Sequence, residues 1–177
     1  MMYLKLDLNG FDLYLRISHY RTSNQANWDE EWCTVDLTVN FGKEVNLLRT
    51  GETMLSCEVE QLKSVFADLL ENKIKERTFL NFIEPDFEFI INPDYHFRNE
   101  SDYGDDRVGQ YLKDIFVDFH IYYWNGGLTD NYLSITLYRE EIEYFLTYLK
   151  LVTRQLKKSD KEITILIEKG IILDYQP

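Results

Sequence analysis

The sequence has few of the residues that mark secreted, fibrous or membrane-spanning proteins. Its 177 residues include two Cys, three Pro and eight Gly, too few for a disulfide scaffold or a low-complexity chain. The longest stretch without Asp, Glu, Lys or Arg is residues 119–129, whereas a membrane-spanning helix needs about 20 apolar residues. Residues 3–7 already alternate apolar and charged side chains, unlike the apolar centre of a signal peptide. We therefore expect a cytoplasmic protein with reduced thiols and no contact with a membrane.

Basic residues are also scarce. The chain has 19 Lys and Arg against 31 Asp and Glu, a formal net charge of −12. Such a charge repels nucleic-acid phosphate and anionic membranes, so neither is expected as a partner. Residues 84–118 alone contain ten acids and three bases. This local excess either keeps the protein soluble or steers a basic partner, and both interpretations stay open here.

The chain does contain enough hydrophobic residues to form one core. Hydrophobic residues make up 45% of the sequence and aromatic residues 15%, which excludes a disordered chain. The length fits one domain. Because no internal repeat and no linker are visible, residues 1–177 are predicted to form a single domain.

Alternation of apolar and polar residues predicts the strands. Residues 3–8 and 11–18 flank Asn9-Gly10, and residues 115–124 and 131–138 flank Asn125-Gly126-Gly127. Both patterns are typical of hairpins, since Asn and Gly tolerate the positive φ of tight turns. Further strands are predicted at 32–39, 45–49, 78–83 and 86–91, and a third hairpin at 163–167 and 171–175.

Apolar residues at spacings of three and four predict two main helices. The first covers 56–72, with Ser56 as its N-cap, and the second covers 139–158. Residues 92–113 are polar and acidic and are predicted to form a long loop. Together these elements predict an α+β fold, with two main helices packed on a curved or sandwich-like, mostly antiparallel sheet.

No motif in the sequence points to catalysis or to a cofactor. Asp94-x-His96 and Asp118-x-His120 pair a carboxylate with an imidazole, but a tight metal site needs three or four converging ligands. Cys33 is in phase with the apolar residues of its strand, which predicts a buried and inert thiol. The sequence has no nucleophile elbow, no phosphate-binding glycine loop and no His-Glu-x-x-His. We predict no catalytic, metal or cofactor-binding site.

Aromatic residues beside acids mark a candidate binding surface. Tyr and Trp supply large rigid contact areas, and acids steer a basic partner. One such group surrounds the second predicted hairpin, where we expect Tyr123 in the core and some of the other aromatic side chains to point outward. The predicted partner-binding residues are Asp94, Tyr95, Glu100, Asp102, Tyr103, Asp105, Asp106 and Trp124.

Four motifs between residues 32 and 152 carry a family resemblance. They are Trp32-Cys33-Thr34-Val35, the leucine-rich helix at 59–70 before Phe82-x-Glu84-Pro85, the hydrophobic strand at 117–122, and Asp130-Asn131-Tyr132-Leu133. Their order resembles the WapI-like immunity proteins, small bacterial proteins that protect a cell from a contact-dependent toxin.

The resemblance implies a protein without catalysis or cofactor that neutralises a cognate toxin domain by stoichiometric binding. The acidity of the chain predicts a basic toxin domain as partner, bound by a monomer or weak homodimer. The alternative is an acidic regulatory or scaffold domain of unrelated role, and an enzyme ranks third.

Overall fold

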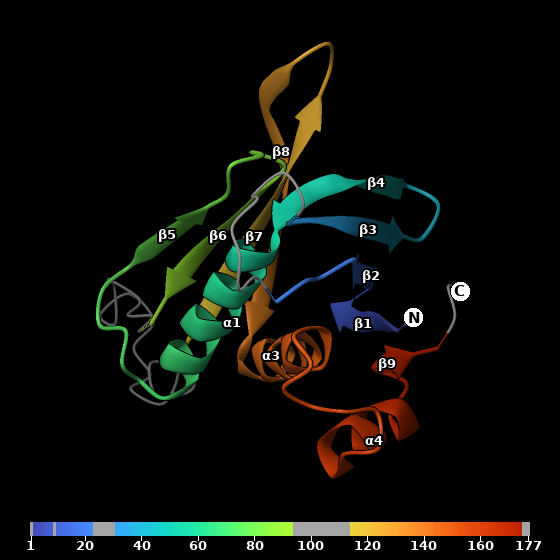
Figure 1. The fold of residues 1–177 in the computed structure, drawn as a ribbon. Coiled ribbons are helices and arrows are strands. Elements are labelled where there is room, and N and C mark those ends of the chain that lie inside the picture. The colour runs from blue at the N-terminus through green and yellow to red at the C-terminus, as the bar shows by residue number, and fades with distance from the viewer. Residues whose placement is uncertain (1, 9, 23–30, 94–113, 175–177) are drawn as a thin grey trace, which may run out of the picture.

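The fold consists of two antiparallel sheets and three helices in the described part of the chain (Figure 1). The computed structural model describes residues 2–8, 10–22, 31–93 and 114–174. The predicted α+β class is confirmed. Sheet A has the order β4 (Val45–Leu55), β3 (Trp32–Phe41), β2 (Phe11–Ser18), β1 (Tyr3–Leu8), β9 (Ile172–Leu173); sheet B has β5 (Thr78–Asn81), β6 (Phe87–Asn92), β7 (Phe116–Trp124), β8 (Leu128–Tyr138); the helices are α1 (Ser56–Leu70), α3 (Arg139–Val152) and α4 (Lys161–Glu168).

Both sheets turn their apolar faces toward one core, which α1 and α3 complete. Phe66 of α1 is central to it, because its ring meets Phe89 of β6 at 5.8 Å and Phe145 of α3 at 5.4 Å, both edge to face. Phe89 in turn stacks on Phe119 of β7 at 4.5 Å. These rings join both helices to sheet B, and removing one buried Phe costs about 3–5 kcal/mol.

The predicted strands differ from the observed ones mainly in length. The strand predicted at 45–49 continues to Leu55 as β4, and the one predicted at 131–138 already begins at Leu128 as β8. Both are edge strands, paired on one side by long neighbours. Their far ends have weaker apolar alternation, so the partner strand extends them. None of the helices in the described residues is long and apolar enough to cross a membrane.

The first helix begins one residue before the helix predicted from a Ser56 cap. Leu55 is the N-cap, and Ser56 is the first helical residue. The buried carboxylate of Glu58 accepts hydrogen bonds from the backbone N–H of Leu55 and of Ile83, both at 2.7 Å. The prediction missed this because Glu58 caps the helix from inside its first turn. The same carboxylate ties α1 to the connection between β5 and β6.

The second main helix, α3, is shorter than the predicted 139–158. It ends at Val152, and Arg154 then adopts a left-handed backbone with φ of 62°. The backbone N–H of Leu156 bonds back to the carbonyl of Lys150 at 3.0 Å, which closes the helix end. The basic residues that suggested a longer helix lie beyond this turn.

The third predicted hairpin, at 163–167 and 171–175, is wrong. Helix α4 occupies its first half, and the second half contributes only β9, which pairs with β1. Ile163 and Leu166 are buried, whereas Ile165 is 40% exposed. That is helical spacing, and a short run of apolar residues fits both periods in sequence.

Candidate protein-docking surface

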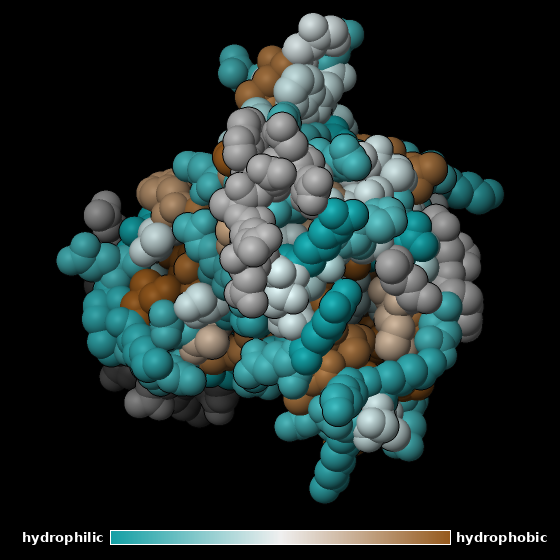
Figure 2. Space-filling view, in the orientation of Figure 1, coloured by the Kyte–Doolittle hydropathy of each residue, from teal (hydrophilic) through white to brown (hydrophobic). Residues whose placement is uncertain are grey.

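The outer end of the β7–β8 hairpin stands away from the body of the protein (Figure 1). Its turn closes with a hydrogen bond from Asn125 N–H to the Gly127 carbonyl at 2.9 Å, and Gly126 has φ of 69°. Trp124 is 46% exposed and Leu128 47% exposed beside this turn. In the space-filling view the hairpin shows hydrophobic and hydrophilic residues side by side (Figure 2). Exposed aromatic and aliphatic side chains of this kind anchor protein interfaces.

The core position predicted for Tyr123 is wrong, because its side chain is 37% exposed. The alternation along β7 holds up to Ile121, which is fully buried. Beyond it the hairpin extends past the body, so an inward-phased residue has no layer to pack against. Tyr123 is therefore exposed, although its place in the alternation of β7 is that of a core residue.

The outer face of sheet B continues from this end of the hairpin along β6, β7 and β8. We define it by Glu88, Asp118, His120, Tyr122 and Tyr132. The His120 ring stacks on Tyr132 at 4.2 Å. Its Nδ1 lies 3.0 Å from Glu88 Oε2, and the Tyr122 hydroxyl donates to the same oxygen at 3.0 Å. Burial and this hydrogen bond raise the pKa of Tyr122. The network fixes the rings in place before any partner arrives.

An arginine from sheet A anchors the base of the hairpin. Arg49 of β4 donates from Nη1 to Asp86 Oδ1 at 2.7 Å and from Nη2 to the Tyr122 carbonyl at 2.5 Å. The Tyr122 N–H bonds to the Asp86 carbonyl at 3.0 Å. Since Arg49 and Asp86 are largely buried, these contacts give the projecting hairpin a rigid base. A rigid surface loses less entropy when it binds.

The charge of sheet B has one sign. Its four strands contain the acids Glu88, Asp118 and Asp130 and no Lys or Arg. The exposed rings and these carboxylates form a surface suited to a basic partner. Chemically, the arrangement offers contact area and negative potential.

A comparison with protein-family models matches residues 4–157 to the immunity protein WapI-like family. The chain belongs to this family. The match covers both main helices and all strands except β9, and it ends before α4. A search of curated proteins finds no match for the chain. Membership supports a toxin-neutralising role in general and confirms the resemblance seen in the sequence.

In this immunity-family protein, one predicted partner-binding residue falls on the candidate surface. Trp124 is exposed at the end of β7. The predicted loop 92–113 begins differently, because Asn92 is the last residue of β6. The remaining predicted site residues lie outside the described residues: Asp94, Tyr95, Glu100, Asp102, Tyr103, Asp105 and Asp106.

Of the side chains considered for metal binding or nucleophilic chemistry, Asp94 and His96 lie outside the described residues, and Asp118, His120 and Cys33 have structural partners. Asp118 accepts a hydrogen bond from Thr136 Oγ1 at 2.9 Å, whereas His120 pairs with Glu88. The parts of the chain that the structure describes hold no group of three His, Cys, Asp or Glu placed to bind a metal ion. Cys33 is a buried core thiol, as predicted, and burial raises its pKa.

Proposed function

We propose that the protein neutralises a cognate toxin domain by one-to-one binding, without catalysis, through an acidic surface with exposed Tyr and Trp side chains. Family membership supports the role. The observation that carries the choice of surface is the charge of sheet B, whose strands hold acids and exposed rings and no base. The acids and tyrosines from Asp94 to Asp106, which follow β6 in sequence, belong to the same proposed surface.

The two residue types have different tasks. The carboxylates accelerate the encounter with a basic toxin domain, because electrostatic steering raises association rates. Trp124 and Tyr132 supply the lasting contact, because large rings in a desolvated centre carry most of the affinity of an interface. Binding of this kind needs no bound group in the immunity protein itself.

The test is a calorimetric titration with the toxin domain encoded next to the gene, at low and moderate salt. We expect one-to-one binding, with an association rate that falls as salt screens the acids. Equimolar protein should also abolish the toxin's activity. No binding at either salt concentration would contradict the proposal and leave the acidic regulatory or scaffold domain as the better interpretation.

Matched charge reversals locate the surface. The triple variant Asp102→Lys, Asp105→Lys, Asp106→Lys should associate at least about ten times more slowly at low salt. Its control reverses three exposed acids elsewhere and changes the net charge equally. Equal association rates for both triples would show that only total charge matters. The control residues are Glu44, Glu162 and Glu168.

A further inference from the structure

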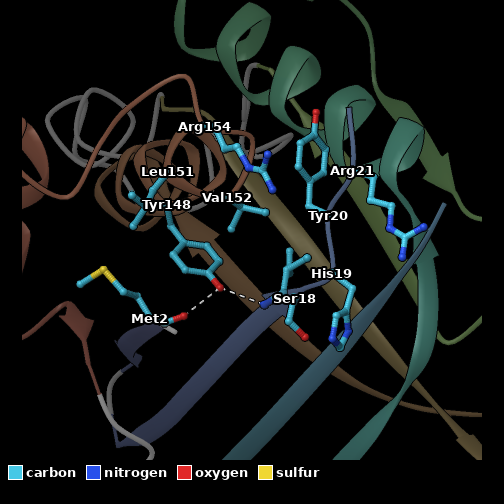
Figure 3. A pocket seen from close by; sticks show the side chains of 10 residues that line it. Met2, Ser18, His19, Tyr20, Arg21, Tyr148, Leu151, Val152 and Arg154 are labelled. Carbon is cyan, nitrogen blue, oxygen red and sulfur yellow. Dashed lines mark hydrogen bonds between the residues drawn. The ribbon is translucent and has the colours of Figure 1, made fainter. Parts of the chain in front are cut away.

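A cavity of about 480 Å³ opens between the end of β2 and the end of α3 (Figure 3). None of its lining residues belongs to sheet B. Its floor is mainly apolar, formed by Ile17, Leu151 and Val152. The buried Tyr148 hydroxyl lies at the base, where it accepts from the Ile17 N–H at 2.9 Å and donates to the Met2 carbonyl at 3.3 Å. These two hydrogen bonds hold the Tyr148 ring in place and satisfy its hydroxyl as both donor and acceptor.

The rim of the cavity is basic, in a protein of net charge −12. His19, Arg21 and Arg154 line it, and no acid does among the described residues. The guanidinium of Arg154 lies between Val152 and Tyr20 (Figure 3). Within the described ranges the Arg154 side chain forms no ion pair and no hydrogen bond.

The carboxylate that is bonded to Tyr20 already has a cation as partner. Glu60 accepts a short hydrogen bond from the Tyr20 hydroxyl and pairs with Lys63 Nζ at 2.5 Å. His19 is held on the outer side, with Nδ1 3.0 Å from Thr34 Oγ1. Among the described residues that line the cavity, Arg154 is thus a cation without an acidic partner.

Backbone strain gathers at the same place. The structure describes three non-glycine residues with positive φ, and two of them, His19 at 61° and Arg154 at 62°, line this cavity. The third, Asn72, follows α1, where Asn is an ordinary residue for a helix end. Arg154 occupies the equivalent position after α3, which glycine usually takes. Such conformations cost free energy and cluster at ligand-binding positions.

We propose that this cavity binds an organic anion whose carboxylate pairs with Arg154 and whose apolar body lies against Leu151 and Val152. A guanidinium binds a carboxylate through two parallel hydrogen bonds. The volume lies in the range of small-molecule sites, about 300–1,000 Å³. The macrodipole of α3 favours a cation after its last turn, but it gives no reason for the strained backbone. A free acid and an acidic peptide residue share this chemistry.

The test titrates the full chain with phenylacetate and with phenylacetamide, which differ mainly in charge, and follows backbone amide signals by NMR. We expect shifts confined to residues 17–21 and 148–154, and at least ten-fold tighter binding of the acid. N-acetyl-Phe-Glu-amide serves as the peptide probe. Tighter binding of this peptide assigns the site to peptides, and tighter binding of phenylacetate assigns it to free acids. Equal affinity for acid and amide would overturn the proposal.

Arg154→Gly separates binding from folding. Glycine adopts φ of 62° without strain, so the variant should unfold at a higher denaturant midpoint and yet lose the ten-fold preference for the acid. Arg154→Lys should keep part of the preference. Asn72→Gly is the matched control, because it relaxes the same conformation after α1 and should leave acid binding unchanged. Full acid affinity in folded Arg154→Gly would also overturn the proposal.

Discussion

The outer faces of the two sheets use their polar residues in opposite ways. On sheet A, Arg16 pairs with Asp36, and its guanidinium also lies 5.0 Å from the Tyr3 ring centre. Lys5 pairs with Asp12 at 3.4 Å in the adjoining strands. Lys5 and Arg16 are thus each paired with an acid of this face, and each also lies over a tyrosine ring, Lys5 over Tyr14 and Arg16 over Tyr3.

On sheet B the same alternation places polar residues outside, yet its acids have no cation on the strands around them. Glu88 is bonded to His120 and Tyr122, and Asp118 to Thr136. These contacts satisfy hydrogen bonds without adding Lys or Arg. The difference teaches that ion pairs within the face of sheet A stabilise the fold directly, whereas the acids of sheet B are held without Lys or Arg, which is the feature behind the binding surface proposed above.

The largest expected effect concerns stability on sheet A. Asp36 is 7% exposed and accepts from Arg16 Nε at 2.5 Å. Asp36→Ala leaves a partly buried arginine unpaired and should cost about 3 kcal/mol of unfolding free energy. Asp118→Ala on sheet B removes a hydrogen bond from the uncharged Thr136 hydroxyl to the carboxylate and leaves no Arg or Lys unpaired, so it should cost only about 1.5 kcal/mol. Urea denaturation measures both, and equal costs would remove the proposed distinction between the faces.

The next effect concerns binding by sheet B. Trp124→Ala should weaken toxin binding by about 2 kcal/mol, or roughly thirty-fold, because it removes an aromatic anchor. Its control is Leu48→Ala on the outer face of sheet A, where the side chain is 66% exposed. The control should change affinity less than about two-fold, and both variants should keep their stability within about 0.5 kcal/mol. Equal losses would place the interface elsewhere.

A smaller effect should appear in association rates. Asp118→Asn with Asp130→Asn removes two negative charges from sheet B, and Asp7→Asn with Asp12→Asn removes two from sheet A. We expect the first pair to slow toxin association about three- to ten-fold at low salt, and the second to change it little. Stopped-flow measurements at two salt concentrations separate the cases. A slower rate that persists at high salt would indicate lost contacts rather than lost steering.

Local sequence patterns predicted the hairpins, because each depends on alternation over a few residues and on an Asn-Gly turn. Trp124 is predicted as a binding residue because aromatic residues cluster around the second hairpin, and its role in binding stays a prediction. The stacking of His120 on Tyr132 could not be predicted, since it depends on the register that pairs Glu88 with His120 and Tyr122 with Tyr132. Register is a long-range property of the sheet.

The exposure of side chains at the end of the β7–β8 hairpin could not be predicted from the sequence either. Tyr123 continues the inward phase of β7, but the strand register shifts between Tyr122 and Trp124 and this end of the hairpin projects beyond the body of the protein, so its side chain is exposed. Leu128 precedes the predicted strand 131–138 and shares the outward phase of Tyr132. Near the C-terminal end, the apolar residues around Ile163 fit both the period of a strand and that of a helix. Tertiary packing of Ile163 and Leu166 selects the helix α4.

The smallest effect concerns the ion pair that closes the open end of the β7–β8 hairpin. Asp114 precedes β7 and Arg139 follows β8, with Arg139 Nη2 2.7 Å from Asp114 Oδ1. Burial alone would raise the pKa of Asp114, but hydrogen bonds from Arg139 and from the Ile115 N–H outweigh it and lower this pKa. The pair therefore adds stability above the unfolded pKa near 4 and loses it as pH falls through the lower folded pKa.

Asp114→Asn tests this ion pair. The pair bears on the comparison of the two sheets, because it places an arginine beside sheet B but outside its strands. Both side chains are more than one third exposed, so water and salt screen the pair. The substitution should cost less than about 1 kcal/mol at pH 7, and the cost should shrink in about 1 M salt and disappear at acid pH, where the wild-type carboxyl is also neutral. Urea unfolding of Asp114→Asn, Arg139→Gln and the double variant measures the coupling. A cost that stays constant in acid and in high salt would mean that Asp114 acts through the geometry of its bond to the Ile115 N–H rather than through its charge.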